Sequence, residues 1–191
     1  MKQESIFEEH AFLIRDFLTP EECAGFIQSS EKIGYEEAPI HMGDSTIIIK
    51  DYRDNLRAMQ DDPDTANRLF ERMKPGLPQR VAGMTPVGLN ERLRFYRYDK
   101  GHYFAPHHDG SFRRNRYEFS LYTVLIYLNE GFEGGSTDLL NDDDSVLYRL
   151  VPETGMAFLF RHEMLHTGAE VLNGSKYVLR SDVMYRLPMA L

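Results

Sequence analysis

Two amphipathic helices are expected in the first part of the chain. Residues 11–18 are apolar enough for a strand, and Thr19-Pro20-Glu21-Glu22 then combines an N-cap, a first-turn proline and a capping-box glutamate. The helix that follows should end near Gly34, and its mostly apolar face consists of Cys23, Phe26, Ile27, Ser30 and Ile33. A second helix should start near Asp62-Pro63 and stop at Pro75-Gly76, with a buried stripe of Ala66, Leu69, Phe70 and Met73.

From about Asn90 onward the pattern changes to short runs of aromatic and β-branched residues separated by turn residues. This texture is typical of a sandwich or barrel, and it predicts strands over residues 92–98, 119–128, 136–140, 145–151, 155–160, 166–172 and 177–185. Such strands suit a double-stranded β-helix, or jelly roll, with the N-terminal helices packed on one sheet. The expected fold class is mainly β (α+β). We expect one domain over residues 1–191, with a helical front part at about 1–88 and a jelly-roll core at about 89–187.

Composition indicates which cellular compartment and which kind of partner to expect. Hydrophobic residues make up 42% and charged residues 27%, which is ordinary for a globular protein. No apolar run approaches the roughly 18 residues of a membrane span, and the acidic first ten residues lack the apolar core of a signal peptide, so we expect a cytoplasmic protein without a membrane segment. The single cysteine, Cys23, agrees with a reducing compartment. The net charge of −8 argues against a nucleic acid as the main partner.

A candidate metal site begins in the aromatic-rich segment that runs from Tyr98 to Asp109. His107 and Asp109 are two residues apart, and residues i and i+2 of a strand share a face. His166 is available far downstream to complete a set of two histidines and one carboxylate. Such a set holds an iron ion and leaves its opposite side open for a co-substrate and oxygen. By itself a His-x-Asp pair is weak evidence, because a hydrogen-bonded structural histidine is the simpler interpretation.

Two cations follow the last histidine on a predicted strand. Lys176 and Arg180 share a face with Val178, so both should project into the same cavity as the metal. A buried cation needs an anionic partner, and a ligand with a carboxylate would supply one. The alternative is exposure to solvent beside acids such as Asp182.

Four motifs in order resemble the iron(II)- and 2-oxoglutarate-dependent oxygenases, specifically the prolyl 4-hydroxylase-like branch. The motifs are Tyr98 and Gly101 before Pro106-His107-x-Asp109, a strand over 122–129, a turn over 134–137, and His166-x-Gly-x-x-Val-x-x-Gly-x-Lys176-Tyr177. Together they cover roughly residues 88–186, and four elements in the right order are far more specific than any one of them.

The resemblance implies a residue-by-residue assignment. His107, Asp109 and His166 correspond to the catalytic metal ligands. Lys176 corresponds to the basic residue for the distal carboxylate of 2-oxoglutarate, although Arg180 is an alternative because a guanidinium binds a carboxylate bidentately. Tyr98 and Tyr127 are similar to hydroxyls that help to hold this co-substrate, with Thr137 a weaker candidate.

The resemblance also implies a reaction. The cofactors would be Fe(II), 2-oxoglutarate and O2, with ascorbate as a supporting reductant, and the products would be succinate and CO2. The substrate would be a C–H bond of a protein side chain, with prolyl the first candidate, or of a small molecule. Asp182 stands where prolyl hydroxylases tend to carry a tryptophan, so we expect the substrate side to differ.

Two other enzyme classes share parts of this pattern. His162-Glu163-Met164-Leu165-His166 spells the H-E-x-x-H of zinc proteases, but that motif works only on a helix, and here it follows a predicted strand. A zinc or manganese cupin-like enzyme would use the same three ligands without 2-oxoglutarate. The tyrosines and the two cations of the last strand argue against it.

Several features leave their roles open. His108 should point away from the metal by strand alternation, as a packing residue or a support for the ligands. Arg113, Arg114 and Arg116 would either attract an acidic substrate or simply pair with Glu118 or face solvent, and we favour the second interpretation. Residues 40–60 are polar enough for a lid over the cleft. Substrate identity and oligomeric state are not predicted.

Overall fold

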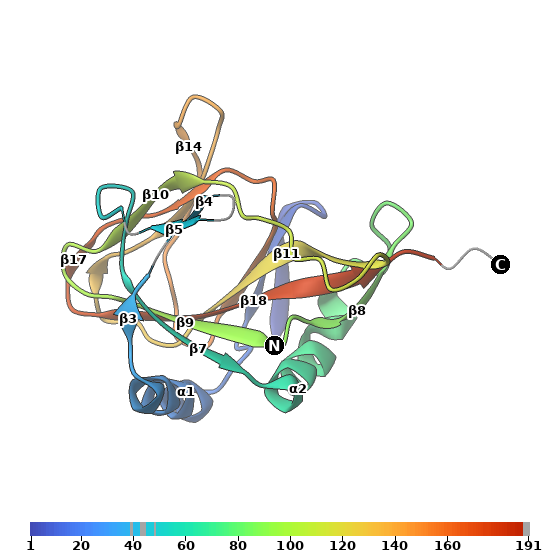
Figure 1. Ribbon diagram of the computed structural model, residues 1–191, viewed down its shortest axis with the longest axis horizontal. Helices are drawn as coiled ribbons and strands as arrows, with labels where there is room; N and C mark the ends of the chain where they lie inside the picture. The colour runs from blue at the N-terminus through green and yellow to red at the C-terminus, as the bar shows by residue number, and fades with distance from the viewer. Residues whose placement is uncertain (39, 43–44, 48, 189–191) are drawn as a thin grey trace.

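Two antiparallel β-sheets face each other in the computed structural model, which describes residues 1–38, 40–42, 45–47 and 49–188 (Figure 1). The large sheet has the strand order β1-β2-β15-β11-β18-β9-β7-β3, with β8 paired to β18. In that order its strands are β1 (Lys2–Phe7), β2 (Ala11–Arg15), β15 (Ala157–Arg161), β11 (Glu118–Tyr127), β18 (Lys176–Arg186), β9 (Arg92–Tyr98), β7 (Leu56–Asp61), β3 (Glu36–Glu37) and β8 (Thr85–Leu89).

The small sheet has the order β14-β13-β16-β10-β6. Its strands are β14 (Val146–Leu150), β13 (Thr137–Leu140), β16 (His166–Gly168), β10 (Tyr103–His107) and β6 (Arg53–Asp54). Two further strand pairs are β12 (Glu133–Gly134) with β17 (Val171–Asn173), and β4 (Ile40–Met42) with β5 (Ser45–Ile47). The predicted double-stranded β-helix architecture is confirmed.

Both predicted helices are present and begin where their caps predict. Helix α1 (Pro20–Ile33) starts with a reciprocal capping box between Thr19 and Glu22, and helix α2 (Pro63–Met73) starts where the Asp62 side chain accepts from the Thr65 amide. A 3₁₀ turn (Lys74–Gly76) follows α2. The helices pack on one face of the large sheet, as predicted, with β10 and β14 on its other side (Figure 1). None of the helices in the described ranges has the length and hydropathy to cross a membrane.

Three details differ from the sequence prediction. Residues 1–89 contain strands as well as the two helices, so a helical front part describes them incompletely. The predicted strand 166–172 is divided into β16 and β17, because the Ala169 amide leaves the ladder to donate to the Ser136 carbonyl. β10 was predicted only as an extended segment; its proline, Pro106, lowers the strand signal.

Strand alternation sorts side chains between two apolar cores. Along β18, Val178 joins the core between the two sheets, whereas Leu179 and Val183 join the core under the helices. Lys176 and Arg180 have the same parity as Val178 and therefore face the small sheet. The candidate site lies between the sheets for this reason.

Candidate metal centre and co-substrate pocket

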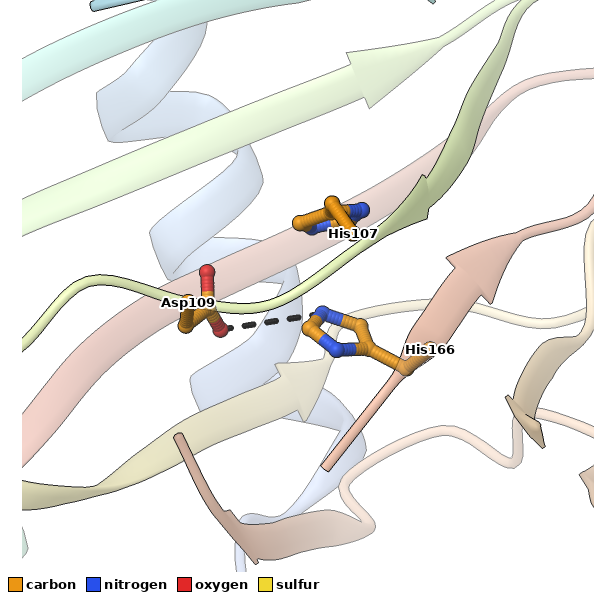
Figure 2. A group of neighbouring side chains, drawn as sticks. All are labelled: His107, Asp109 and His166. Carbon is orange, nitrogen blue, oxygen red and sulfur yellow. Dashed lines mark ion pairs between the residues drawn. The ribbon is translucent and has the colours of Figure 1, made fainter. Parts of the chain in front are cut away.

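Strand pairing brings the three predicted metal ligands together. His107 and His166 are direct cross-strand partners on β10 and β16, and their ring centroids are 4.1 Å apart. Asp109 lies just beyond the end of β10, where its amide donates to the His162 carbonyl at 3.1 Å. The Nε2 atom of His166 is 3.6 Å from Oδ2 of Asp109 (Figure 2). Residues 59 positions apart in the sequence thus share one site.

Both imidazoles are held in the form that binds metals. Nδ1 of His107 lies 2.7 Å from the Ala105 carbonyl, and Nδ1 of His166 lies 3.0 Å from the Met164 carbonyl. A carbonyl only accepts, so each Nδ1 carries the proton and each Nε2 keeps its lone pair. Burial and the neighbouring His166 lower the pKa of His107 to about 3, and burial also lowers the pKa of His166. Both rings are therefore neutral at physiological pH.

Asp109 is ionised and has both oxygens engaged. Burial alone would raise the pKa of this carboxyl, but Arg180, the two histidines and Thr123 together lower it well below its usual range. Nη2 of Arg180 is 2.8 Å from Oδ1, and the Thr123 hydroxyl donates to Oδ2 at 2.5 Å. These two contacts fix the orientation of the carboxylate.

The donor set fits a ferrous ion. Two imidazole nitrogens and one carboxylate oxygen lie within 4.8 Å of one another. Ligand atoms about 2.1 Å from a shared ion, and on one face of it, are about 3 Å apart, so closure onto an ion needs side-chain movements on the order of 1 Å. Three protein ligands of this kind leave coordination positions free for a co-substrate, which is the arrangement of non-haem iron oxygenases.

A pocket between the sheets joins this centre to Lys176. Its lining consists of Tyr96, Tyr98, Phe104, His107, Asp109, Leu125, Thr137, His166, Gly168, Lys176, Val178 and Arg180. Lys176 is 3% exposed, and its ammonium donates to the Gly135 carbonyl at 2.7 Å. Burial lowers the pKa of Lys176 to about 7. No carboxylate of the described residues lies within ion-pair distance of it, so an anionic ligand fits this end of the pocket.

The predicted hydroxyl residues lie at the same end. The Tyr98 ring lines the pocket, 5.3 Å from the Lys176 ammonium. Tyr127 is fully buried behind the lining, and its hydroxyl donates to Thr137 at 2.8 Å. Thr137 lines the pocket and is therefore the member of this pair that can face a ligand. Tyr96, Phe104 and Leu125 also line the pocket and were missed by the sequence analysis.

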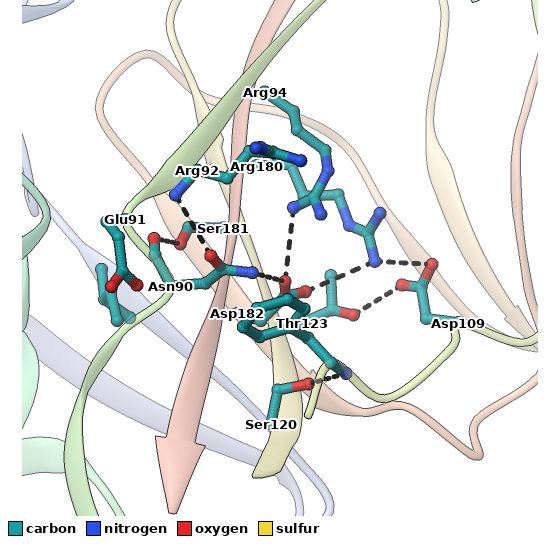
Figure 3. A network of polar contacts seen from close by, with 12 residues as sticks. Asn90, Glu91, Arg92, Arg94, Asp109, Ser120, Thr123, Arg180, Ser181 and Asp182 are labelled. Carbon is teal, nitrogen blue, oxygen red and sulfur yellow. Dashed lines mark hydrogen bonds and ion pairs between the residues drawn. The ribbon is translucent and has the colours of Figure 1, made fainter. Parts of the chain in front are cut away.

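The second cation, Arg180, has protein partners. Besides Asp109, its Nη2 lies 3.5 Å from Asp182, which also receives hydrogen bonds from Arg94 and Asn90 (Figure 3). Asp182 is 2% exposed, so the alternative of solvent-exposed cations is wrong here. Arg180 is already paired with carboxylates, whereas Lys176 has no such partner in the described part of the chain.

His162 has a role that the sequence did not reveal. It lies in a turn rather than a helix, so the H-E-x-x-H interpretation is excluded. A relay of hydrogen bonds connects His162 to Asp109. The Phe112 amide donates to Ser120 Oγ (2.7 Å), which lies 2.8 Å from His162 Nε2. On the other side of the ring, His162 Nδ1 lies 3.0 Å from Thr123 Oγ1, which donates to Asp109. The carboxylate at the end of the relay only accepts, so Thr123 donates to Asp109 and accepts from Nδ1–H of His162. Burial lowers the pKa of His162, and Nε2 of the neutral ring then accepts from the Ser120 hydroxyl. No local motif could have predicted this relay.

The remaining candidates have surface roles or are partly outside the described residues. His108 is exposed rather than packed. Arg114 pairs with Glu118 at 3.0 Å and with Glu91, which confirms the preferred interpretation for this one of the three arginines. Arg113 and Arg116 lie over the rings of Phe119 and Tyr117. Part of the proposed lid at 40–60 is outside the described residues, but the Tyr52 ring packs against Phe104 beside the pocket.

The family comparison agrees with the geometry. Residues 93–181 match the model of the 2OG-Fe(II) oxygenase superfamily. Prolyl 4-hydroxylase 1 of Arabidopsis thaliana is 26% identical over 195 residues, which cover 86% of this chain and 65% of the plant protein. A PKHD-type hydroxylase of Paracoccus denitrificans is 29% identical over 178 residues, which cover 86% of this chain and 73% of that protein. The chain thus spans slightly less than two thirds of the Arabidopsis relative.

Solved structures share the fold. A viral collagen prolyl hydroxylase of Paramecium bursaria Chlorella virus-1, in complex with 2-oxoglutarate, aligns with a TM-score of 0.63 at 17% identity and covers 96% of this chain and 100% of that chain. A prolyl hydroxylase of Trichoplax adhaerens, in complex with a peptide fragment of the hypoxia-inducible factor oxygen degradation domain, aligns with a TM-score of 0.69 at 16% identity and covers 92% of this chain and 83% of that chain.

The fold and the donor set are those found in non-haem iron oxygenases with a double-stranded β-helix. The segment that is similar to the 2OG-Fe(II) oxygenase superfamily covers slightly less than half of the chain, and the chain is also similar to prolyl 4-hydroxylase-like relatives. The cofactors of this family are Fe(II), 2-oxoglutarate and O2, as the sequence resemblance implied.

Proposed function

We propose that the protein is an iron(II)- and 2-oxoglutarate-dependent dioxygenase that hydroxylates a C–H bond and releases succinate and CO2. The observation that carries this proposal is the convergence of His107, Asp109 and His166 within 4.8 Å, next to a pocket that ends in the Lys176 ammonium, which pairs with no carboxylate of the described residues. Residues 1–191 act as one catalytic domain in this proposal.

The roles of the chain's own residues follow from their surroundings. His107, Asp109 and His166 hold the ferrous ion. Lys176 receives the distal carboxylate of 2-oxoglutarate, because it is buried and lacks an anion among the described residues. Arg180 instead keeps Asp109 in place. The proposal thus assigns Lys176 to the co-substrate and Arg180 to a metal ligand, and these partners support Lys176 over Arg180.

The hydroxyl-bearing residues support the co-substrate. Tyr98 and Thr137 face the pocket beside Lys176, and Tyr127 orients Thr137 from behind. The apolar side chains of Phe104, Leu125 and Val178 keep the local dielectric constant low, which strengthens the ion pair between Lys176 and a carboxylate.

When bound, the ferrous ion and 2-oxoglutarate supply oxygen activation and oxidative decarboxylation, so the difficult chemistry belongs to the cofactors. The protein holds the ligands, seats the co-substrate carboxylate and directs one substrate C–H bond toward the reacting centre. In the balanced reaction, substrate, 2-oxoglutarate and O2 give hydroxylated substrate, succinate and CO2.

Prolyl or another protein side chain is the first substrate candidate, and a small molecule is the second. The relatives' names support the first, since both the Arabidopsis and the viral proteins are called prolyl hydroxylases. The Trichoplax structure contains a peptide fragment. The PKHD-type relative carries only the general description of a hydroxylase.

Succinate formation tests the proposal. The purified protein is incubated with Fe(II), ascorbate, O2 and 2-oxoglutarate, with and without a panel of proline-containing peptides, and succinate and peptide mass are measured. We expect succinate from the wild-type protein, increased by an accepted peptide that gains one oxygen atom, and none from Asp109→Ala. A zinc or manganese cupin-like enzyme would bind metal and form no succinate; that result would contradict the proposal.

A further inference from the structure

Arg53 is a buried arginine beside the metal centre that lacks an anionic partner among the described residues. It lies on β6 at the edge of the small sheet, opposite Phe104 of β10, and is 8% exposed. Its Nε donates to the Asn55 side chain at 2.6 Å. Its Nη2 is buried and has no hydrogen-bond partner among the residues that the structure describes. A buried guanidinium without an anionic partner destabilises the folded state, unless a bound ligand supplies the missing anion.

The guanidinium lies against two aromatic rings that line the pocket. Its carbon lies 4.4 Å from the centroid of Phe104 and 4.8 Å from that of Tyr96, and both rings line the pocket. Phe104 in turn stacks on the His107 imidazole, with centroids 3.6 Å apart. Arg53 therefore stands one aromatic ring away from a proposed metal ligand.

The charges around this point do not balance. Arg53, Arg94 and Arg180 surround Tyr96, and they bring the pKa of this fully buried phenol down to about 8 although burial alone would raise it. The carboxylates facing them are Asp109, held by Arg180, and Asp182, held by Arg94 and Arg180.

The cofactors do not remove this excess. An ion of charge +2 and a 2-oxoglutarate of charge −2 cancel, so together they add no net negative charge to offset the arginines. With the two aspartates set against Arg94 and Arg180, the positive charge of Arg53 is left over among the residues that the structure describes. The chain as a whole has a net charge of −8, so this positive region is local to the pocket.

We infer that Arg53, between Phe104 and Tyr96, is a subsite for a carboxylate of the substrate, so that the substrate is an anion whose charged group lies close to the C–H bond that reacts. This inference rests on the proposed function and deepens it by naming the substrate's chemical class. The carboxylate belongs either to a small organic acid or to an acidic side chain of a peptide, and both present the same group to the guanidinium.

Paramagnetic relaxation measures the binding of small probes at this subsite, so the true substrate need not be known. The protein is loaded with Mn(II) and saturated with 2-oxoglutarate, and proton relaxation is followed for propionate and for its neutral analogue propionamide. A second pair of probes is acetyl-prolyl-glutamate amide and acetyl-prolyl-glutamine amide. We expect each acid to bind at least tenfold more tightly than its neutral analogue, since a hydrogen bond to a charged group contributes a factor of this size. The tighter acid identifies the source of the carboxylate.

Two variants and one control assign the effect to Arg53. Arg53→Gln should weaken binding of the acids about tenfold or more and leave the neutral probes unchanged. Asn55→Asp places a carboxylate against Nε and should weaken the acids several-fold while Arg53 stays in place, which keeps the test decisive if Arg53→Gln does not fold. Arg92→Gln, at an exposed arginine paired with Asp61, should leave all affinities within twofold.

The inference is overturned if acids and neutral analogues bind the wild-type protein alike, or if Asn55→Asp and a folded Arg53→Gln keep the preference for acids. If the proposed function itself is wrong, the result is different, because the protein then fails to take up Mn(II) and 2-oxoglutarate during loading, before any probe is added.

Discussion

Lys176 and Arg180 face the same pocket from one strand, and their partners give them different roles. Lys176 donates a hydrogen bond to the Gly135 carbonyl and has no anionic partner among the described residues, and burial holds its pKa at about 7, whereas Arg180 is paired with Asp109. A 2-oxoglutarate carboxylate that pairs with Lys176 favours the charged ammonium and must raise this pKa again.

Binding of 2-oxoglutarate should therefore take up a proton above neutral pH. Below pH 7 the ammonium is already charged and uptake is small. At pH 8 most of the free protein has a neutral Lys176, so uptake should approach one proton, and the affinity should fall as the pH rises through 7. Calorimetry of 2-oxoglutarate binding to the Mn(II)-loaded protein in buffers of different ionisation enthalpy measures this. Lys176→Met should lose the uptake and bind 2-oxoglutarate at least tenfold more weakly; unchanged uptake in this variant would remove Lys176 from the co-substrate site.

Thr123 should tune metal affinity without contacting the metal. Thr123→Val removes the hydroxyl that links His162 to Asp109, with little change in shape, and groups that orient metal ligands typically contribute about 10- to 100-fold in affinity. We expect the dissociation constant for Co(II) to rise by about tenfold or more. Thr123→Ser retains the hydroxyl and is the matched control. Equal affinities in both variants would show that the relay does not support Asp109.

At the scale of elements, one glycine fixes the junction between α1 and the large sheet. Gly155 has φ +78°, and a Cβ there would collide with the Leu18 carbonyl, while its own carbonyl accepts from the amides of Phe17 and Leu18. Gly155→Ala should lower the free energy of unfolding by about 2–4 kcal/mol, through the left-handed backbone and the clash. Chemical denaturation measures this. Gly25→Ala, in open space on α1, should be neutral or stabilising by up to about 1 kcal/mol; similar losses in both variants would contradict the role of the turn.

Local sequence signals predicted where the helices begin, whereas the arrangement of several site residues depends on long-range packing. The caps at Thr19 and Asp62 depend on residues at most three positions away, so both helix starts could be read from the sequence. The meeting of His107 with His166 followed from the order of the motifs. The relay through His162 and the place of Arg53 depend on strands far apart in the chain. No periodicity or short motif encodes those contacts.

At the scale of the whole molecule, the ligands should connect the two sheets. The proposed metal ligands lie on or next to β10 and β16 of the small sheet, whereas Lys176 lies on β18 of the large sheet. A 2-oxoglutarate bound to both would cross the gap between the sheets and stabilise the native state by linkage.

Thermal unfolding should show this connection. A 2-oxoglutarate concentration one hundred times its dissociation constant adds about 2.7 kcal/mol to the free energy of unfolding. For a chain of this size, that corresponds to a rise of about 5–10 °C in Tm. We expect this rise when 2-oxoglutarate is added to the Mn(II)-loaded protein, and its reversal when EDTA removes the metal. Lys176→Met should keep the increment due to metal and lose the one due to 2-oxoglutarate. An equal response to 2-oxoglutarate with and without metal would contradict a shared site.

The most direct test is anaerobic titration of the apoprotein with Fe(II) and 2-oxoglutarate, followed by the visible charge-transfer absorption of the iron–oxoacid chelate. The account predicts that the band appears only with both components and saturates at one iron per chain. It should be absent in Asp109→Ala and retained in Asp142→Ala, a matched change at an exposed turn. A protein that takes up no ferrous ion, or an Asp109→Ala variant that develops the full band, would contradict the assignment of the metal centre.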